Sequence, residues 1–143
     1  MKPYLLAHPE TEIGTALPAL VKPEVTRMQL IKFAGASGDF NPIHTVESVG
    51  QEAGLGGVIA HGMLIMGFAG QAVETWVPRA ALKKFGVRFS AITRPGDSIE
   101  VRGELSSKEE TEAGTLVKIK VQAVDQKGEV KLKGTCEALL PRI

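Results

Sequence analysis

Residues 61–76 read HGMLIMGFAGQAVETW, a mostly apolar run that Gln71 and Glu74 interrupt. Its apolar side chains fall on nearly every side of a helix, which predicts a helix that the rest of the protein surrounds. The run is shorter than the roughly 20 residues that a transmembrane helix needs, so we expect a core helix and no membrane span. Gly67 and Gly70 cost about 1 kcal/mol each relative to Ala, which is tolerable where a neighbouring backbone must approach closely. A helix lying in a curved sheet has that need.

The segments after this helix alternate between apolar and polar residues with the period of two that strands show. Such alternation indicates an antiparallel sheet with one face on the core and the other in water. The four runs cover residues 85–91, 99–105, 117–123 and 130–138, and Thr15–Val21 is a candidate N-terminal strand. Asp125–Gly128 is the expected hairpin turn before the last run, in which Lys131 and Lys133 fall on the polar face. The predicted fold class is α+β, with an antiparallel sheet wrapped around a long central apolar helix.

Composition excludes several classes of protein. The 143 residues suit a single domain spanning residues 1–143. A net charge of +1, with only five Phe, one Trp and one Tyr, argues against a nucleic-acid partner. The lone cysteine, Cys136, cannot form an internal disulfide and lies in a strand run, as a small core residue would. Without an apolar leader at the N-terminus, we expect a cytoplasmic protein with no membrane association.

Charge is unevenly placed along the chain. Residues 39–76 contain four acidic residues and no Lys or Arg, whereas residues 77–94 contain five basic residues and no acidic one. One interpretation is a solvated strand face beside an acidic turn. The other is an entrance that steers a phosphate-bearing substrate, with Arg79, Lys83 and Lys84 near its phosphates.

A polar turn follows the first predicted helix, whose start is marked by a capping box at Thr26–Gln29. In this turn Asp39 and His44 flank Phe-Asn-Pro-Ile, and the proline restricts both its own backbone and that of Asn41. A carboxylate and an imidazole facing one small volume can hold a water and move its protons. The alternative is that Asp39 and Asn41 only satisfy turn amides while His44 packs under the loop.

His61 and Gly62 stand where the apolar helix begins. Free N–H groups at a helix N-terminus favour negative charge, and a glycine there lets a ligand carbonyl come close, so Gly62 is a candidate oxyanion site. His61 is expected as a cap or wall of the substrate-binding site. A rival interpretation combines Asp39, His44 and His61 as a metal site, although no local ligand spacing supports it. We expect no role for His8, which lies in a polar segment.

Four segments of the sequence resemble those of a known family. Residues 33–44, FAGASGDFNPIH, closely resemble the hydratase-2 motif of MaoC-like proteins, the (R)-specific enoyl-CoA hydratases and (3R)-hydroxyacyl-thioester dehydratases. Residues 57–64, GVIAHGML, are similar to the family's segment leading into its central helix. Residues 85–89 and 94–97, FGVRF and RPGD, resemble its next strand and turn. The likeness covers most of the chain from about Val25 onward, and the first motif is quite specific.

The resemblance implies a hot-dog fold that pairs as a homodimer or with a related, non-catalytic hot-dog subunit. It places the family's active pair on Asp39 and His44, with Asn41 supporting the site and Gly62 supplying the carbonyl-binding amide. It also implies a thioester substrate carried by CoA or acyl-carrier protein, and no metal or organic cofactor.

We therefore expect reversible conversion between a trans-2-enoyl thioester and a (3R)-hydroxyacyl thioester, with Asp39 and His44 sharing one water. Asp39 is expected as the base and His44 as the acid, and the reverse assignment stays open. One alternative is a non-catalytic acyl-binding partner subunit, against which the intact pair argues. Another is a hot-dog thioesterase, a class that lacks this turn. The accepted acyl length should depend on Met63, Met66 and Phe68 of the central helix.

Overall fold

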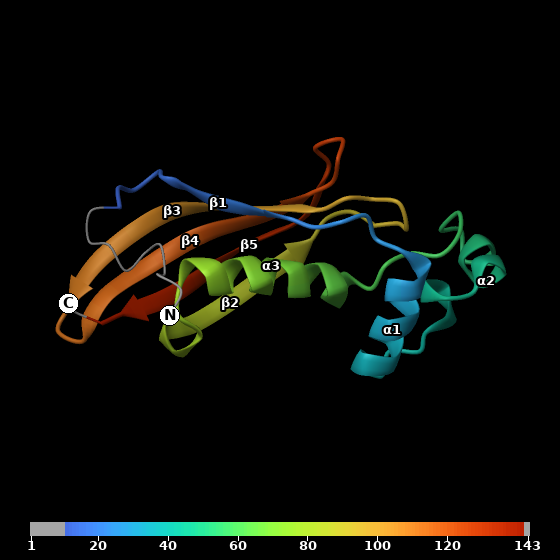
Figure 1. Ribbon diagram of the computed structural model, residues 1–143, viewed down its shortest axis with the longest axis horizontal. Coiled ribbons are helices and arrows are strands. Elements are labelled where there is room, and N and C mark those ends of the chain that lie inside the picture. Colours follow the sequence, from blue (N-terminus) through green and yellow to red (C-terminus); the bar gives the residue numbers. More distant parts are fainter. Residues whose placement is uncertain (1–10, 142–143) are drawn as a thin grey trace.

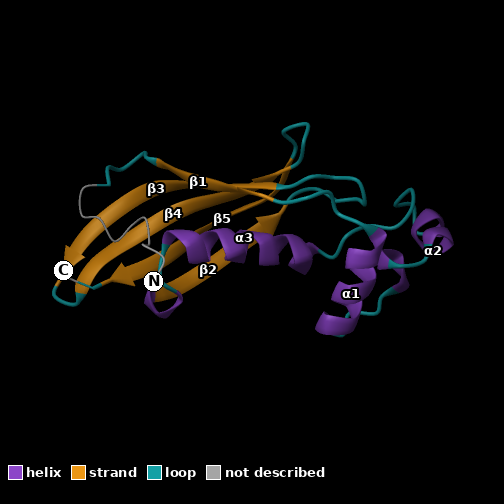
Figure 2. Ribbon diagram, in the orientation of Figure 1, coloured by secondary structure: helices purple, strands orange, loops and turns teal. Residues whose placement is uncertain are grey.

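The computed structural model describes residues 11–141. The long helix α3 (Gly62–Trp76) lies against one face of a curved five-stranded antiparallel sheet (Figure 1). The strand order is β1-β3-β4-β5-β2, so β1 and β2 form the edges. The strands are β1 (Ala16–Val21), β2 (Leu82–Phe89), β3 (Glu100–Thr111), β4 (Gly114–Val124) and β5 (Val130–Leu140). The shorter helices α1 (Arg27–Ser37) and α2 (Glu47–Glu52) lie beyond one end of the sheet, where α3 begins (Figures 1 and 2).

This architecture confirms the predicted α+β class and is the hot-dog arrangement that the resemblance implies. Every predicted strand is present, including the N-terminal one, although β2 begins at Leu82 and ends at Phe89, two residues before the predicted end. The hairpin turn is also confirmed. The Asp125 carboxylate oxygen Oδ1 accepts the amides of Lys127 and Glu129, both at 2.9 Å, and so closes the turn between β4 and β5.

Helix α3 carries the core on the side that faces the sheet. Its buried residues are Leu64, Ile65, Phe68, Ala69, Ala72, Val73 and Trp76. The prediction that protein surrounds this helix is wrong for the chain alone, because one sheet covers only one side of a helix. Met63 is 58% exposed, and Gly67, Gln71 and Glu74 continue the open stripe along the helix.

The close approach between α3 and the backbone of the sheet occurs at Gly103 of β3, and not at Gly67 or Gly70 of the helix. A Cβ added at Gly67 would meet nothing within 4 Å, and one at Gly70 would make only ordinary contact. In contrast, a Cβ at Gly103 on β3 would lie 2.5 Å from the Trp76 ring. The Trp76 indole lies against this bare backbone and donates its Nε1–H to the Pro18 carbonyl at 2.9 Å. Gly103 therefore makes room for the largest core side chain.

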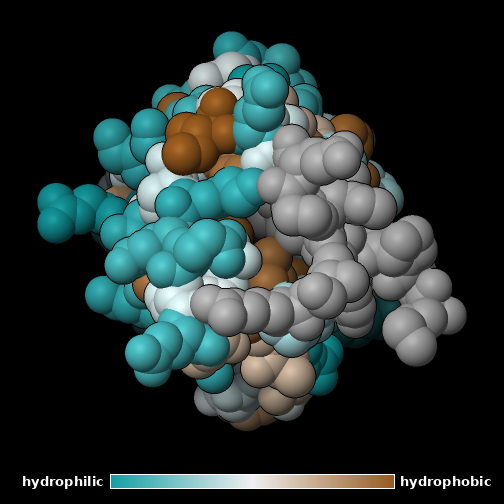
Figure 3. All heavy atoms as spheres, turned by 90° about the vertical axis from the view of Figure 1, so that its left-hand side faces the viewer, coloured by the Kyte–Doolittle hydropathy of each residue, from teal (hydrophilic) through white to brown (hydrophobic). Residues whose placement is uncertain are grey.

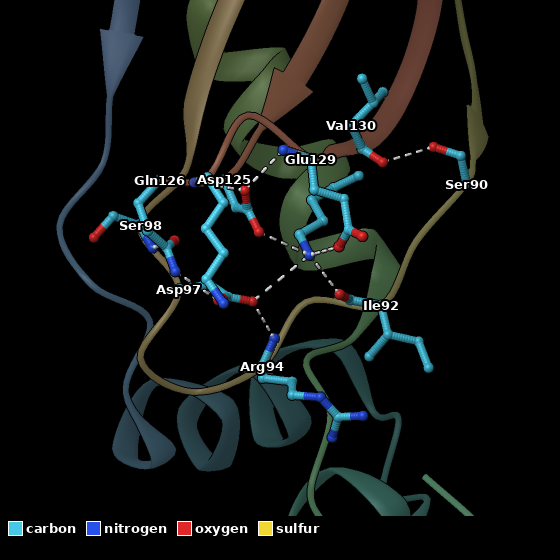
Figure 4. Close-up of polar contacts among 11 residues, drawn as sticks. Ser90, Ile92, Arg94, Asp97, Ser98, Asp125, Gln126, Glu129 and Val130 are labelled. Atoms are coloured by element: carbon cyan, nitrogen blue, oxygen red, sulfur yellow. Dashed lines mark hydrogen bonds and ion pairs between the residues drawn. The ribbon is translucent and has the colours of Figure 1, made fainter. Parts of the chain in front are cut away.

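The prediction that Lys131 lies on the solvent-exposed face of its strand is also wrong. Strand alternation placed it on the wet face of β5, yet it is only 3% exposed. The alternation breaks at this residue, because Ala123 pairs with Leu132 and Val124 with Val130, which leaves Lys131 as the extra residue of β5. Here residues 92–97 and the β4–β5 turn cover Lys131 and surround its ammonium with Asp97, Asp125 and Glu129 (Figure 4).

The lone cysteine lies in the core. Cys136 is buried, as predicted, and burial raises the pKa of its thiol to about 11, with the Glu137 charge adding to the effect. The thiol is therefore protonated at neutral pH and is no nucleophile.

No helix among residues 11–141 is long and apolar enough to cross a membrane. The end of the molecule away from α1 and α2 presents mostly hydrophilic side chains, with a few apolar ones among them (Figure 3).

Adding a methyl group at Gly103 should therefore destabilise the protein. We expect Gly103→Ala to lower the free energy of unfolding by about 1–3 kcal/mol, because the Trp76 ring cannot move without disturbing the core. Urea unfolding followed by tryptophan fluorescence measures this. Gly86→Ala on edge strand β2 is the matched control, since its Cβ would meet nothing within 4 Å. A loss no larger than that of the control would contradict this account of the core.

Candidate active site

The turn after α1 holds Asp39 with one carboxylate oxygen and leaves the other free for chemistry. Gly38 ends α1 in the left-handed conformation (φ 75°), with its N–H bound to the Ala34 carbonyl at 2.9 Å. Asp39 Oδ1 then accepts the Asn41 amide, and Asn41 Oδ1 accepts the Ile43 amide, both at 3.2 Å. These bonds are the turn contacts of the alternative interpretation, so Asp39 and Asn41 do shape the turn. Asp39 Oδ2 remains available and its side chain is 51% exposed.

His44 ends the 3-10 turn Pro42–His44 and lies buried beneath it. Its Nδ1 is 2.8 Å from the Ile59 carbonyl oxygen. A carbonyl can only accept, so Nδ1 carries the hydrogen and Nε2 of the neutral ring carries a lone pair. Nε2 lies 3.7 Å from Asp39 Oδ2, too far for a direct hydrogen bond. The two acceptors are spaced so that one water can donate a hydrogen to each.

Residues 58–60 support this geometry through three successive amides, each bound to a different element. The Val58 amide donates to Glu47 Oε2 of α2 at 3.3 Å. The Ile59 amide donates to the Ile43 carbonyl at 3.1 Å, and the Ala60 amide donates to the Thr93 carbonyl at 2.8 Å. The Ile59 carbonyl that orients His44 is therefore itself held in place.

His61 forms the wall behind His44. The two rings stack with centroids 3.8 Å apart, and Phe33 meets His61 edge-on at 4.9 Å. His61 Nε2 donates to the Asp39 carbonyl at 3.2 Å, and the ring makes no side-chain cap to α3. Burial lowers the pKa of His61, and the nearby His44 lowers it further, against the hydrogen bond to Asp39. His61 is therefore neutral at pH 7 and serves as a supporting ring.

Gly62 is the first residue of α3 and follows this wall directly. It lines a cavity of about 150 Å³ together with Phe89 and Thr93. A Cβ at Gly62 would lie 3.2 Å from the Phe89 ring, so a larger residue would crowd the cavity. Thr93 Oγ1 is buried and has no hydrogen-bond partner among the described residues. Thr93 and Ile59 were missed in the sequence, because Ile59 acts through its backbone carbonyl and Thr93 is distant along the chain.

The structure thus brings Asp39, His44 and His61 together, with one polar atom from each within 4.8 Å of the others. Asn41 lies in the turn and Gly62 at the helix start, as the motif requires. His8 lies outside the described residues.

Comparison with known proteins identifies the family of this chain. The MaoC like domain family matches residues 9–127. The chain belongs to this family. The MaoC-like chain is 31% identical over 97 residues to the (R)-specific enoyl-CoA hydratase of Rhodospirillum rubrum, covering 66% of this chain and 67% of that protein. The solved structure of an R-hydratase from Pseudomonas aeruginosa matches with a TM-score of 0.77 at 26% identity, covering 94% of this chain and 84% of that one.

A much longer relative shares the domain. The fatty acid synthase beta subunit hexB of Dothistroma septosporum is 31% identical over 115 residues, which cover 78% of this chain. The chain spans only 6% of that subunit, and 4% of the corresponding subunit of Gibberella zeae. The MaoC-like chain thus corresponds to one small part of these synthase subunits.

A metal ion fits this MaoC-like site poorly, although the residue types allow one. His44 Nδ1 and His61 Nε2 are already bound to carbonyls, so only His44 Nε2 and His61 Nδ1 could be ligands. The two rings are stacked with their planes 24° apart, so their lone pairs lie in two nearly parallel planes, whereas the ligands of one ion must converge on one point. The arrangement favours a water held between Asp39 and His44.

The basic cluster of Arg79, Lys83 and Lys84 lies away from this site within the chain. Arg79 follows the far end of α3 and pairs with Glu74. A helix of 15 residues is about 22 Å long, so the cluster lies a helix length from Gly62. Lys83 and Lys84 are exposed on β2. Of the two interpretations of the charge pattern, this position favours a solvated surface for Arg79, Lys83 and Lys84.

The lowered pKa of His61 gives a testable pH dependence. The unfolded chain binds a proton at this side chain more readily than the folded protein does, so stability falls as the pH drops below about 6.5. His61→Phe keeps an aromatic ring over His44 but cannot titrate. We expect the loss of unfolding free energy between about pH 7.5 and about pH 5.5 to be smaller in this variant. An equal loss in both proteins, measured by urea unfolding, would show that His61 does not titrate abnormally.

Proposed function

We propose that this MaoC-like domain reversibly hydrates trans-2-enoyl thioesters to (3R)-hydroxyacyl thioesters. The observation that carries the proposal is the pair of facing acceptors, Asp39 Oδ2 and His44 Nε2, 3.7 Å apart. A water donating to both turns its lone pairs away from them, toward a substrate. The names of the Rhodospirillum rubrum hydratase and the Pseudomonas aeruginosa R-hydratase support this reaction class.

In the hydration direction, the water oxygen bonds to C3 of the enoyl group and one water proton passes to Asp39. Asp39 passes this proton to the lone pair of His44 Nε2, and the imidazolium so formed gives it to C2 on the same face as the π bond between C2 and C3 is lost. The pair thereby returns to its starting state, a carboxylate beside a neutral imidazole. His44 keeps its Nδ1–H bond to Ile59 in both protonation states, so one ring orientation serves every step.

Between these steps, negative charge develops on the thioester oxygen. We assign its stabilisation to the Gly62 amide at the N-terminus of α3, where the helix dipole favours an anion and the glycine has no side chain of its own to block approach. The thioester itself acidifies the α-carbon, so the proposed route uses no metal or organic cofactor. CoA and acyl-carrier protein both remain candidate carriers of the acyl group.

The direct test is hydration of crotonyl-CoA, followed by the loss of enoyl absorbance. We expect Asp39→Asn and His44→Ala each to lower kcat about 100-fold or more, because each removes a proton-transfer group. Glu52→Gln, an exposed acid on α2, is the matched control and should retain full activity. Circular dichroism confirms that each variant is folded. Near-normal turnover in both site variants would contradict the proposal.

The same assay separates the alternatives. A thioesterase would release free CoA, which a thiol reagent detects, without hydrating the double bond. A non-catalytic partner subunit would do neither alone. The Asp39–His44 geometry favours the hydratase, because a partner without chemistry needs no oriented imidazole beside a free carboxylate.

We also propose that the chain pairs with a second copy or with a related hot-dog subunit. Within residues 11–141, edge strand β2 has a hydrogen-bonded neighbour on one side only, β5. Beside it, the open stripe of α3 carries Met63 and Gly67. Large apolar side chains are also exposed on α1, at the end of β2 and in the loops around the site: Met28, Ile31, Phe40, Phe89 and Ile92. A partner on this side would cover them.

The mass in solution tests this pairing. We expect light scattering to give twice the 15.2 kDa chain mass. Gly67→Glu should shift the protein toward the monomer, because the chain itself leaves room at Gly67 but a partner would not. Gln122→Glu on β4, which adds the same charge on the other side of the sheet, should leave the mass unchanged. A wild-type protein that stays monomeric at high concentration would overturn self-association.

A further inference from the structure

Lys131 is a buried cation that the proposed chemistry does not use. Its ammonium donates to Glu129 Oε1 at 2.5 Å and to the Ile92 carbonyl at 2.8 Å. It also lies 3.2 Å from Asp125 Oδ2 and 3.8 Å from Asp97 Oδ2. Burial lowers the pKa of Lys131, but the hydrogen bonds and charges of these acids outweigh burial and raise it. Lys131 is therefore a permanent cation at neutral pH.

This cluster fixes the loop that follows β2. Figure 4 shows Asp97 and Asp125 on one side of the ammonium, and the Glu129 carboxylate and the Ile92 carbonyl on the other. The Lys131 backbone carbonyl accepts the Ser90 amide at 2.9 Å, so the backbone and the side chain of one residue both bind residues 90–92. At the other end of the loop, Asp97 Oδ2 accepts the Arg94 amide at 2.8 Å.

The fixed loop leads directly to the catalytic imidazole through backbone groups. Ile92 precedes Thr93, whose carbonyl accepts the Ala60 amide at 2.8 Å. The Ala60 N–H and the Ile59 C=O belong to one peptide group, which is planar and rigid. The Ile59 carbonyl accepts the His44 Nδ1–H at 2.8 Å. The path from Lys131 to His44 thus contains three hydrogen bonds of ordinary length and no flexible side chain between them.

We propose that Lys131 is a positioning residue for His44, which it holds in the Nδ1–H tautomer through residues 92–93 and the peptide group between Ile59 and Ala60. A neutral imidazole has two tautomers, and the bond to Ile59 selects the one whose Nε2 faces Asp39 as an acceptor. The Ala60 N–H bond to Thr93 also polarises the peptide and strengthens the Ile59 carbonyl as an acceptor. This inference rests on the proposed function only for its kinetic consequence.

Removal of the ammonium should therefore act at His44, although the two residues make no direct contact. In Lys131→Met, the Ile92 carbonyl loses its donor and residues 92–93 can shift. The Ile59 peptide then loses its fixed orientation, and the other His44 tautomer gains population. Glu129 binds Lys131 but is not on this path, and the ion pairs with Asp97 and Asp125 remain without it. Glu129→Ala should therefore reduce stability without affecting His44.

The test uses the full chain and two independent readouts. Long-range 1H–15N NMR of the histidine rings reports which nitrogen of His44 carries the hydrogen. Steady-state hydration of crotonyl-CoA reports kcat and KM. For Lys131→Met we expect a measurable fraction of the Nε2–H tautomer, and a kcat about tenfold or more lower with KM nearly unchanged. Glu129→Ala and Lys133→Met, an exposed lysine on the same strand, should retain the tautomer and kcat.

If Lys131→Met does not fold, the charge-balanced variant Lys131→Met/Asp125→Asn replaces it, since it removes one buried charge of each sign. Unchanged His44 tautomer and kcat in a folded Lys131 variant overturn the inference. An equal fall of kcat in Glu129→Ala also overturns it, because the effect would then follow stability. A wild-type protein without hydratase activity, in which loss of Lys131 still shifts the tautomer, refutes the proposed function and leaves the positioning role intact.

Discussion

The hydrogen bond from His44 Nδ1 to the Ile59 carbonyl is the interaction on which the site depends. It determines which nitrogen faces Asp39, and so whether the pair can bind one water through two acceptors. The bond exists because residues 58–60 lie between α2, the turn after α1 and the loop after β2, with one amide bound to each. The start of α3 follows immediately, so the same anchoring places Gly62 beside the pair.

Much of this could be predicted from local sequence. Period-two alternation gave every strand, and Thr26 caps α1 by accepting the Gln29 amide, as its spacing indicates. The motif around Asp39 and His44 identified a polar pair that the fold does bring together. These features depend on residues close together in the chain, where geometry follows from residue type and spacing.

The remaining features depend on contacts between distant segments, which spacing does not report. Lys131 has the polar phase of its strand in the sequence, but the register shifts at this residue and distant segments bury it, among them the loop at residues 92–97. Helix α3 has the composition of a surrounded helix, yet its own sheet covers one side only. The role of Ile59 is carried by its backbone carbonyl, for which no side-chain pattern can be diagnostic. Phe68, on which the accepted acyl length is expected to depend, lies in the core of the chain.

In the proposed reaction, Asp39 and His44 add one water across the double bond of an enoyl thioester. Isotope labelling of crotonyl-CoA hydration, in H₂¹⁸O and separately in D₂O, tests this addition most directly. We expect a (3R)-3-hydroxybutyryl thioester with ¹⁸O at C3, and with one deuterium at C2 added on the same face as the hydroxyl. Addition on opposite faces, an (S) product, or ¹⁸O in a released carboxylate with the double bond intact would contradict it.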